Sequence, residues 1–181
     1  MRILVTGASG SGTSTLGSAL ANRLGCTYLD GDNYFWVKPE PPFTAKRTPE
    51  ERLKLLLEDG KNAGDFVLAG SVDGWGAELE ESFDLIVFLY LSTGIRIDRL
   101  RNREMQRFGA VDAEFLEWAA QYDSGTLEGR SLKKQHDWLA ARGCQIVKLE
   151  GDLTVEERVQ LVLNSMPNPL QGLPTVSMVQ D

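Results

Sequence analysis

The sequence predicts an α/β fold in which a parallel sheet of five strands is covered by helices on both faces. Two observations indicate this fold. Short apolar runs without polar alternation recur along the chain, which is typical of strands buried on both faces. Segments with apolar residues three or four positions apart separate these runs, as expected for crossover helices. The length of 181 residues suits one domain with one core.

The predicted strands and helices alternate along the whole chain. Strands are expected at residues 3–6, 27–29, 66–69, 85–91 and 145–149. Helices are expected after the glycine-rich turn, with Leu16, Leu20 and Leu24 on one face, then from Thr48 onward, at 92–109, 113–122 and 131–142, and around Val155–Val162. Thr48 followed by Pro49 and two acids is a typical helix start. The helices at 92–122 form an insertion between the fourth and fifth strands.

A glycine-rich turn joins the first strand to the first helix. It comprises Gly7, Ser9, Gly10, Ser11, Gly12, Thr13, Ser14 and Thr15, with Ala8 between the first two. Glycines let successive backbone N–H groups point inward, and with the following helix N-terminus they form a cradle for an anion. A hydroxyl just inside the helix, here Ser14, is placed to ligate Mg²⁺. The turn therefore predicts a phosphate-binding site.

One position departs from the phosphate-loop template G-x-x-x-x-G-K-[ST]. Gly7, Gly12 and Ser14 match it, but Thr13 stands where the template has lysine. That lysine normally reaches the β- and γ-phosphates and offsets their charge. Either another cation supplies this charge, or the protein binds nucleotide without efficient phosphoryl transfer.

A dinucleotide-binding site is an alternative for the same turn. Residues 5–10 resemble the start of an extended short-chain dehydrogenase, and Asp30 follows the second strand where a ribose-binding acid is expected. Tyr34 and Lys38 imitate the catalytic pair of that family, but they come too early in the chain. Thr13 also replaces the third glycine of that pattern, so the phosphate loop is the preferred interpretation.

The chain resembles the adenylate and cytidylate kinase branch of P-loop kinases. The resemblance rests on the loop from Gly7 to Leu16, the arginine-rich segment after the fourth strand, and the sequence 150–152 after the fifth. It implies a P-loop NTPase three-layer sandwich with strand order 2-3-1-4-5 and a helical lid. It also implies ATP as co-substrate with Mg²⁺. Residues 1–166 would form the domain, with the lid insertion at about 92–130, and 167–181 a flexible tail.

Acidic residues follow the second and third strands. Residues 29–33 resemble the corresponding stretch of adenylylsulfate kinases, where an acid lies near the acceptor hydroxyl and the metal. A carboxylate here can orient or deprotonate an acceptor, or hold Mg²⁺ through water, and Asp32 is preferred over Asp30 as this catalytic residue. A capped turn with solvated acids is the structural alternative. Asp73 is a weaker candidate, with an ordinary turn as its alternative.

Arginines crowd the expected helix at 92–109. Arg99 and Arg103 lie four positions apart and therefore share a face. In adenylate-kinase-like enzymes, a lid pair at this spacing stacks on the base and clamps phosphates, a task suited to planar, permanently charged guanidinium groups. The resemblance therefore implies catalytic roles for Arg99 and Arg103, and the pair is a candidate replacement for the missing lysine. A solvated helix face is the alternative.

Aromatic residues cluster in the expected loop after the second strand. Asn33 to Trp36, with Phe43 and Arg47, are interpreted either as walls of an acceptor pocket or as packing of the loop against the core. Phe115, Trp118 and Tyr122 are expected in the core, and His136 at the surface.

Composition excludes several classes of partner. A net charge of −7 disfavours nucleic acid and anionic membranes, and no apolar stretch is long enough for a membrane span. Two cysteines and one histidine predict free thiols and no histidine-based metal centre. We therefore expect a cytoplasmic protein; its oligomeric state stays open.

The preferred function is transfer of the γ-phosphoryl group of ATP to a nucleotide, nucleoside or other small metabolite. A nucleotide-binding regulator with little or no turnover is the first alternative, because Thr13 replaces lysine. An NAD(P)-binding protein is the second.

Overall fold

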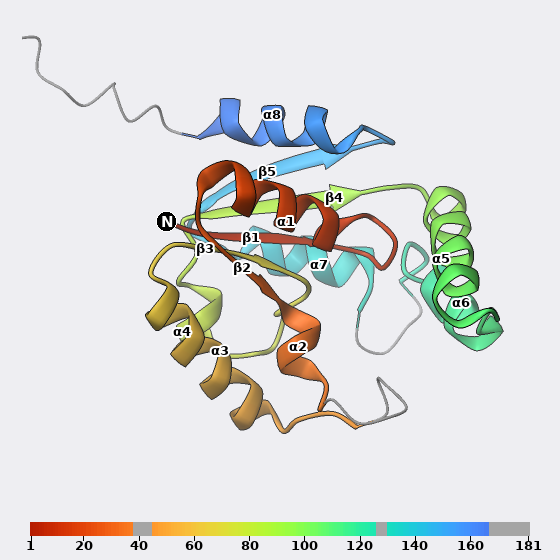
Figure 1. Cartoon of the computed structure of the whole chain (residues 1–181), viewed down its shortest axis with the longest axis horizontal. Helices are drawn as coiled ribbons and strands as arrows, with labels where there is room; N and C mark the ends of the chain where they lie inside the picture. Colours follow the sequence, from red (N-terminus) through yellow and green to blue (C-terminus); the bar gives the residue numbers. More distant parts are fainter. Residues whose placement is uncertain (38–44, 126–129, 167–181) are drawn as a thin grey trace, which may run out of the picture.

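The computed structural model describes residues 1–37, 45–125 and 130–166, and it has the predicted parallel sheet at its centre (Figure 1). The strands are β1 (Arg2–Gly7), β2 (Thr27–Asp30), β3 (Phe66–Ala69), β4 (Leu85–Tyr90) and β5 (Gln145–Glu150). All pairings are parallel, and the strand order is β2-β3-β1-β4-β5. This order confirms the expected 2-3-1-4-5 sheet. The predicted tail, 167–181, lies outside the described residues.

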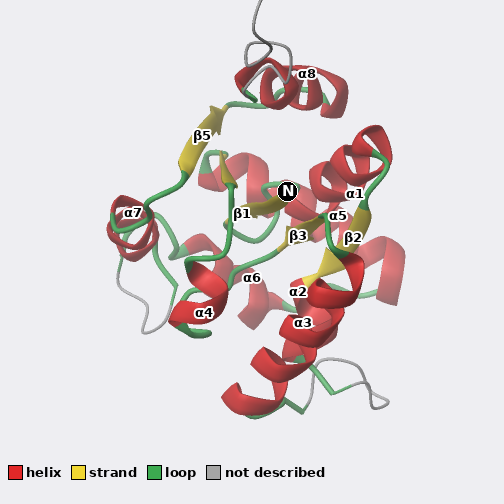
Figure 2. Ribbon diagram, turned by 90° about the vertical axis from the view of Figure 1, so that its left-hand side faces the viewer, coloured by secondary structure: helices red, strands yellow, loops and turns green. Residues whose placement is uncertain are grey.

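Helices connect the strands and cover both faces of the sheet. They are α1 (Thr13–Leu24), α2 (Gly31–Phe35), α3 (Pro49–Ala63), α4 (Ala77–Glu80), α5 (Thr93–Phe108), α6 (Ala113–Ala120), α7 (Leu132–Ala140) and α8 (Val155–Ser165). In Figure 2, α1 and α8 lie on one side of the sheet and α4 and α7 on the other. Among the described residues, no helix is long and apolar enough to cross a membrane.

Alternate residues of the central strands point to two separate cores. Ile3 and Val5 of β1 pack with Leu16 of α1 and Val159 of α8. Leu4, between them, packs on the opposite face with residues of α3, α4 and α7. Because successive side chains of a strand alternate between the two faces, unbroken apolar runs fill both cores. The result is the predicted three-layer arrangement.

The sheet order differs from that of a dinucleotide-binding fold. In the latter, the first strand is hydrogen-bonded to the second. Here β1 pairs with β3 and β4, and β2 occupies the edge of the sheet beyond β3. The short-chain-dehydrogenase alternative is therefore wrong, although its local sequence pattern is present.

The segment after β2 is helical, which the sequence analysis did not predict. Asp30 precedes α2 and accepts a hydrogen bond of 3.0 Å from the backbone N–H of Asp32, as an N-cap residue does. The helix buries Tyr34, whose hydroxyl donates to Asp59 of α3 at 2.8 Å. Tyr34 is thus part of the core and not of an acceptor pocket. Phe43, from the same prediction, lies outside the described residues.

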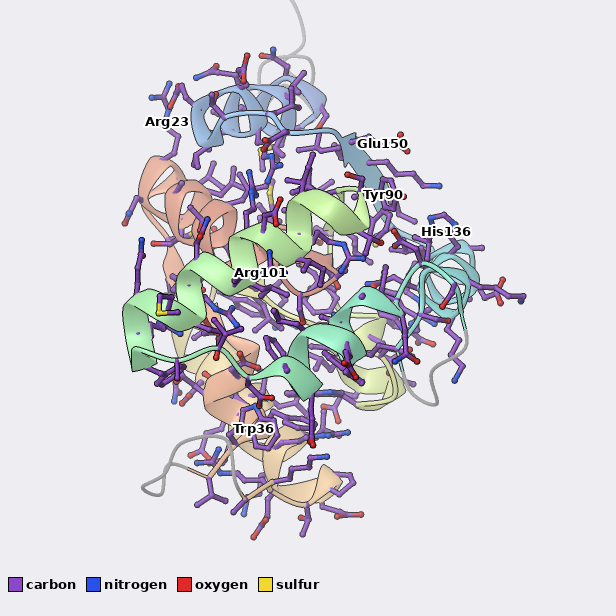
Figure 3. The ribbon with its side chains drawn as sticks, turned by 90° about the vertical axis from the view of Figure 1, so that its right-hand side faces the viewer. Arg23, Trp36, Tyr90, Arg101, His136 and Glu150 are labelled. Atoms are coloured by element: carbon purple, nitrogen blue, oxygen red, sulfur yellow. The ribbon has the colours of Figure 1, made fainter. Side chains whose placement is uncertain are left out.

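The carboxyl ends of all five strands meet at one edge of the sheet. The helical insertion, defined as α5 and α6, stands across this edge and is on the right in Figure 1. It has a small core of its own around Leu100, Leu116 and Ala119. Arg101, labelled in Figure 3, is on the exposed side of α5. The opposite side of α5 faces the loop between β1 and α1.

Candidate functional site

The loop between β1 and α1 has the backbone of an anion cradle. Gly10 and Gly12 have φ angles of 83° and 96°, in the left-handed region that favours glycine. Gly12 is the N-cap residue of α1, and no side chain caps this helix end. The N–H groups of the first turn of α1 therefore keep their capacity to bind an anion, and the helix dipole favours negative charge there.

Two glycines of this loop lie too close to neighbouring backbone for any side chain. A Cβ atom on Gly7 would come within 2.5 Å of the carbonyl oxygen of Leu89. One on Gly10 would come within 2.7 Å of the carbonyl oxygen of Arg96. The loop is thus fixed by contacts with β4 and α5, and the glycine pattern has a structural cause at both positions.

A cleft of about 980 Å³ opens in front of the loop and is bordered by β2, α5 and the start of α8. Eight residues that the sequence assigned phosphate-binding or catalytic roles line it: Gly10, Gly12, Thr13, Ser14, Thr15, Asp32, Arg99 and Arg103. Asn33 and Trp36, suggested as pocket walls, also line the cleft, together with Asp30, Arg107 and Leu153. Gly7 and Ser11, which belong to the same loop, are buried and do not reach the cleft. Ser9 lines a separate, smaller hollow. The structure thus brings most predicted site residues to one cleft.

Oxygen donors suitable for Mg²⁺ border this cleft. Ser14 is exposed in the first turn of α1, and Asp30 and Asp32 lie across the cleft from the end of β2. The described residues contain no cluster of three or more His, Cys, Asp or Glu side chains that could hold a metal alone. Mg²⁺ in nucleotide sites takes one or two protein oxygens and completes its shell with phosphates and water. The donor set fits that mode of binding.

Asp32 reaches the cleft from the first turn of α2. Its carboxylate is accessible to water, yet the protein around it raises its pKa by desolvation and then by the nearby charge of Asp30. The charges of Arg130 and Arg103 act in the opposite direction. A carboxylate with a raised pKa that opens onto a phosphate cradle is suited to accept a proton from an acceptor hydroxyl.

The two predicted arginines of α5 have different surroundings. Arg99 forms an ion pair with Asp152, which follows β5, and one of its terminal nitrogens is 3.6 Å from where a Cβ of Gly12 would be. Arg103 contacts Glu104 at 3.1 Å and lies 5.8 Å from the ring centroid of Phe115. Both side chains are partly exposed and line the cleft. Arg99 is thus near the helix end of the cradle, as a nucleotide clamp requires.

Two further arginines bind the backbone around the loop, and one of them, Arg158, also lines the cleft. Arg96 is 1% exposed; its guanidinium donates to the carbonyl oxygens of Leu91 and Ala119 and forms an ion pair with Asp123 at 3.3 Å. Arg158 of α8 is 4% exposed and donates to the carbonyl oxygen of Ser11. Sequence reasoning saw Arg96 only as one of several arginines and did not select Arg158.

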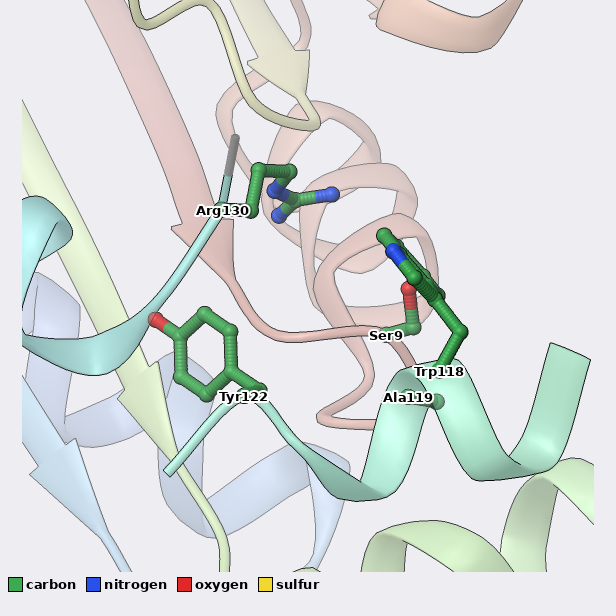
Figure 4. A pocket seen from close by; sticks show the side chains of 5 residues that line it. All are labelled: Ser9, Trp118, Ala119, Tyr122 and Arg130. Atoms are coloured by element: carbon green, nitrogen blue, oxygen red, sulfur yellow. The ribbon is translucent and has the colours of Figure 1, made fainter. Parts of the chain in front are cut away.

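Arg130 is a site residue that sequence reasoning missed. Its Nη2 donates a hydrogen bond of 2.7 Å to the carbonyl oxygen of Gly7, the first residue of the loop. It also borders the small hollow with Ser9, Trp118 and Tyr122, as Figure 4 shows. Arg130 precedes α7 and has no second arginine three or four positions away, unlike Arg99 and Arg103. The available indication was a cation directly before Ser131, the N-cap residue that begins α7.

Asp73 also faces this part of the molecule. Burial and the charge of Glu80 raise its pKa, and the charge of Arg130 lowers it. The negative charges of two carboxylates, Asp32 after β2 and Asp73 after β3, therefore act on Arg130. The weaker sequence candidate, Asp73, thus lies within electrostatic reach of the loop-bound arginine.

Comparisons with known proteins agree with this geometry. A family model described as "AAA domain" matches residues 3–117. An uncharacterized protein of Bacillus subtilis, YqaC, is 45% identical over 172 residues, which cover 90% of this chain and 95% of that protein. A cytidylate kinase of Haloarcula marismortui is 29% identical over 128 residues, covering 65% of this chain and 66% of that enzyme.

A solved structure has the same fold over nearly the whole chain. It is the shikimate kinase of Bacteroides thetaiotaomicron, which is 22% identical, with a TM-score of 0.58 over 91% of this chain and 97% of that one. The sheet order, the glycine loop and these relatives agree with one another. The chain therefore belongs to the AAA domain family, and its fold and relatives support a P-loop nucleotide kinase family.

Proposed function

We propose that this protein transfers the γ-phosphoryl group of Mg²⁺-bound ATP to a hydroxyl or phosphate oxygen of a small metabolite. One observation carries the proposal. The uncapped start of α1 and the carboxylate of Asp32 open onto one cleft. A phosphate cradle that faces a proton acceptor across a space of metabolite size is the arrangement that such a transfer needs.

The residues of the cleft divide into donor and acceptor groups. The backbone of Gly10 to Thr15 would hold the β- and γ-phosphates, and Ser14 would share Mg²⁺ with them. The ion would neutralise phosphate charge during transfer. Arg99, beside Gly12, would cover the nucleotide, and Arg103, farther along α5, would reach toward the transferred group. Asp32 would orient the acceptor hydroxyl and take its proton.

The alternative of a nucleotide-binding regulator keeps one specific observation in its favour. Thr13 provides no charge at the position where transfer normally uses lysine. The regulator and the kinase share the same cradle, so nucleotide binding alone does not distinguish them. Turnover does, because a regulator of this kind would bind Mg²⁺-ATP without releasing ADP faster in the presence of any acceptor.

The test is a steady-state assay of ADP release at saturating Mg²⁺-ATP. The acceptor panel contains nucleoside monophosphates, nucleosides, sugars and hydroxy acids, each compared with a reaction without acceptor. We expect at least one acceptor to raise the rate tenfold or more, about 1.4 kcal/mol of barrier. Binding of Mg²⁺-ATP with no acceptor-dependent rate would contradict the kinase and favour the regulator.

Asp32→Asn tests the assignment of the proton acceptor. With the acceptor identified, we expect kcat to fall by about 10²–10³-fold while the melting temperature stays within about 2 °C, because general-base catalysis contributes this much and the side chain is accessible to water. Asp98→Asn is the matched control, since Asp98 is exposed on α5 and pairs with Arg101. An Asp32→Asn variant with unchanged kcat would remove Asp32 from the mechanism.

A further inference from the structure

The phosphate loop has no cationic side chain of its own. A positive charge that offsets the phosphates must therefore come from a side chain elsewhere in the chain. Thr13 is neutral, whereas phosphoryl transfer places growing negative charge on the leaving β-phosphate. In the described part of the chain, four arginines lie against the loop: Arg96, Arg99, Arg130 and Arg158. Arg103 lines the cleft farther along α5 and is already paired with Glu104. Their contacts decide which of them is available to a bound phosphate.

Two of the four are bound into the scaffold. Arg96 is buried, and all three of its guanidinium nitrogens have hydrogen-bond partners. Arg158 lines the cleft and its Nε has no hydrogen-bond partner, but both of its terminal nitrogens donate to backbone carbonyl groups, those of Ser11 and Gly151. Turning either guanidinium toward a phosphate would leave at least one buried carbonyl oxygen without its donor, which costs about 1–3 kcal/mol for each such group.

Arg99 lies at the end of the loop that is far from the candidate acceptor acids, and so from the γ-phosphoryl group that is transferred. It lies beside Gly12 and is paired with Asp152, on the side of the cleft formed by the segment after β5. The two candidate acceptor acids are elsewhere, after β2 and β3. A cation that stabilises transfer must lie between the cradle and the acceptor.

Arg130 borders the small hollow beside Ser9, is bonded to the loop, and is within electrostatic reach of both acids. Its Nη2 binds the carbonyl oxygen of Gly7 at 2.7 Å, and its Nε is buried with no hydrogen-bond partner. Among the described residues, no carboxylate is within ion-pairing distance of 4.0 Å, so no direct ion pair neutralises its charge. Asp32 and Asp73 still act on it through space. The guanidinium is thus a charged group with spare donors at the acceptor end of the loop.

The backbone of Arg130 is fixed by the start of α7. Ser131, directly after it, caps this helix by accepting a hydrogen bond from the N–H of Lys134. The N–H of Leu132 donates to the carbonyl oxygen of Tyr122 at 2.9 Å. Figure 4 shows the side chain of Arg130 directed to the loop beside Ser9. A side chain held from a helix terminus can be pre-organised for charge stabilisation, as a loop lysine is.

We propose that Arg130 supplies the positive charge that the phosphate loop lacks at Thr13 and is therefore a catalytic residue. The proposal rests on the proposed kinase function. In the reaction, an acceptor oxygen bonds to the γ-phosphorus and its proton passes to Asp32. The bond between the γ-phosphorus and the β,γ-bridging oxygen breaks, and its electron pair stays on ADP. Arg130 donates hydrogen bonds to the γ-phosphoryl oxygens and offsets this charge, a role that the sequence suggested for the pair Arg99 and Arg103.

The experiment compares three proteins: the unchanged protein, the single variant Arg130→Gln, and the double variant that carries both Thr13→Lys and Arg130→Gln. Glutamine keeps polarity and much of the length of the side chain but removes the charge. We expect Arg130→Gln to lower kcat by at least 10²-fold, as for other removed charge-stabilising donors, and to weaken ATP binding by less than tenfold. Adding Thr13→Lys returns the charge to the loop and should recover at least tenfold in kcat. A purely structural role for Arg130 would give no such rescue.

Controls separate this proposal from folding and from the proposed function. Arg101→Gln, on the exposed side of α5, should leave kcat unchanged, and thermal unfolding checks that each variant is folded. A kcat of Arg130→Gln within threefold of the unchanged protein, or no rescue in the folded double variant, would overturn the proposal.

A second readout covers the case in which no acceptor gives turnover, so that the kinase function itself fails. The dissociation constants of Mg²⁺-ATP and Mg²⁺-ADP are then compared. A loss of the ATP preference in Arg130→Gln would still place this residue at the γ-phosphate. An unchanged ratio of the two constants would overturn the proposal independently of catalysis.

Discussion

Arg158 of α8 donates a hydrogen bond of 2.9 Å to the carbonyl oxygen of Ser11, 147 positions earlier in the chain. A second bond of 3.1 Å goes from the same guanidinium to the carbonyl oxygen of Gly151. The last helix therefore holds the phosphate loop and the segment after β5 in one arrangement. Burial, and then the like charge of Arg99, lower the pKa of Arg158, so the contact is made at an electrostatic cost.

Replacing Arg158 with methionine should therefore weaken both stability and nucleotide binding. Methionine keeps the apolar stem but removes the charged donor from two carbonyl oxygens, the buried one of Ser11 and the more accessible one of Gly151. We expect the free energy of unfolding to fall by about 2–4 kcal/mol, since hydrogen bonds to charged groups contribute roughly 1.5–3 kcal/mol each. Urea unfolding measures the loss. Arg23→Met, at the exposed end of α1, is the control and should change stability by less than about 0.5 kcal/mol.

The Gly10→Ala substitution tests the close packing of the phosphate loop. A Cβ at Gly10 would be 2.7 Å from the carbonyl oxygen of Arg96 and 3.1 Å from Leu100, in addition to the unfavourable φ of 83°. The matched control is Gly109→Ala, where φ is 68° but no atom lies within 4 Å of the new Cβ. Both variants carry the cost of the left-handed backbone, about 1–2 kcal/mol, and only Gly10→Ala adds a clash.

We expect Gly10→Ala to be less stable than Gly109→Ala by 1 kcal/mol or more, about the size of an overpacking penalty. Its affinity for Mg²⁺-ATP should also fall by at least tenfold, whereas Gly109→Ala should bind normally. Chemical denaturation and isothermal titration calorimetry measure the two effects. Equal stability of the two variants would show that the loop moves to accommodate the methyl group.

The fold was predictable because its determinants are local. Unbroken apolar runs such as residues 85–91 identify strands that are covered on both faces, and Thr48 with Pro49 identifies the start of α3. The glycine loop was recognisable for the same reason, since its pattern is contiguous. The strand order came from the family resemblance, and the pairing of β1 with β3 and β4 confirms it.

The rest of the site depends on tertiary contacts that leave no local pattern. Nothing near Arg130 indicates that its guanidinium will bind Gly7, 123 positions away. For residues 33–36 the sequence left two interpretations open, pocket walls or core packing. One hydrogen bond to Asp59 and the short helix α2 make Tyr34 a core residue, whereas Asn33 and Trp36 line the cleft. Asp32 was found because it follows the second strand, and Arg99 because it lies in the arginine-rich helix after the fourth strand. The roles of both residues stay predictions.

The last prediction concerns a buried network that connects the segment after α6 to the phosphate-loop strand. The hydroxyl of Tyr122 donates to Gln135 at 2.8 Å, and the amide of Gln135 donates to the hydroxyl of Thr6 at 2.7 Å. Burial raises the pKa of Tyr122 to about 12, although the charges of Arg130 and Arg96 act in the opposite direction. In the unfolded chain this pKa is about 10.

Because the folded pKa of Tyr122 is the higher one, the neutral phenol stabilises the fold fully below pH 10, and this contribution is lost as the pH rises from 10 through 12. Tyr122→Phe should lower the free energy of unfolding at pH 7 by about 1 kcal/mol, the net value of one hydrogen bond. The stability difference between the two proteins should then shrink above pH 10, because phenylalanine does not ionise. Urea unfolding at pH 7, 10 and 11 measures it. A difference that stays constant over this range would mean that Tyr122 does not titrate differently on folding.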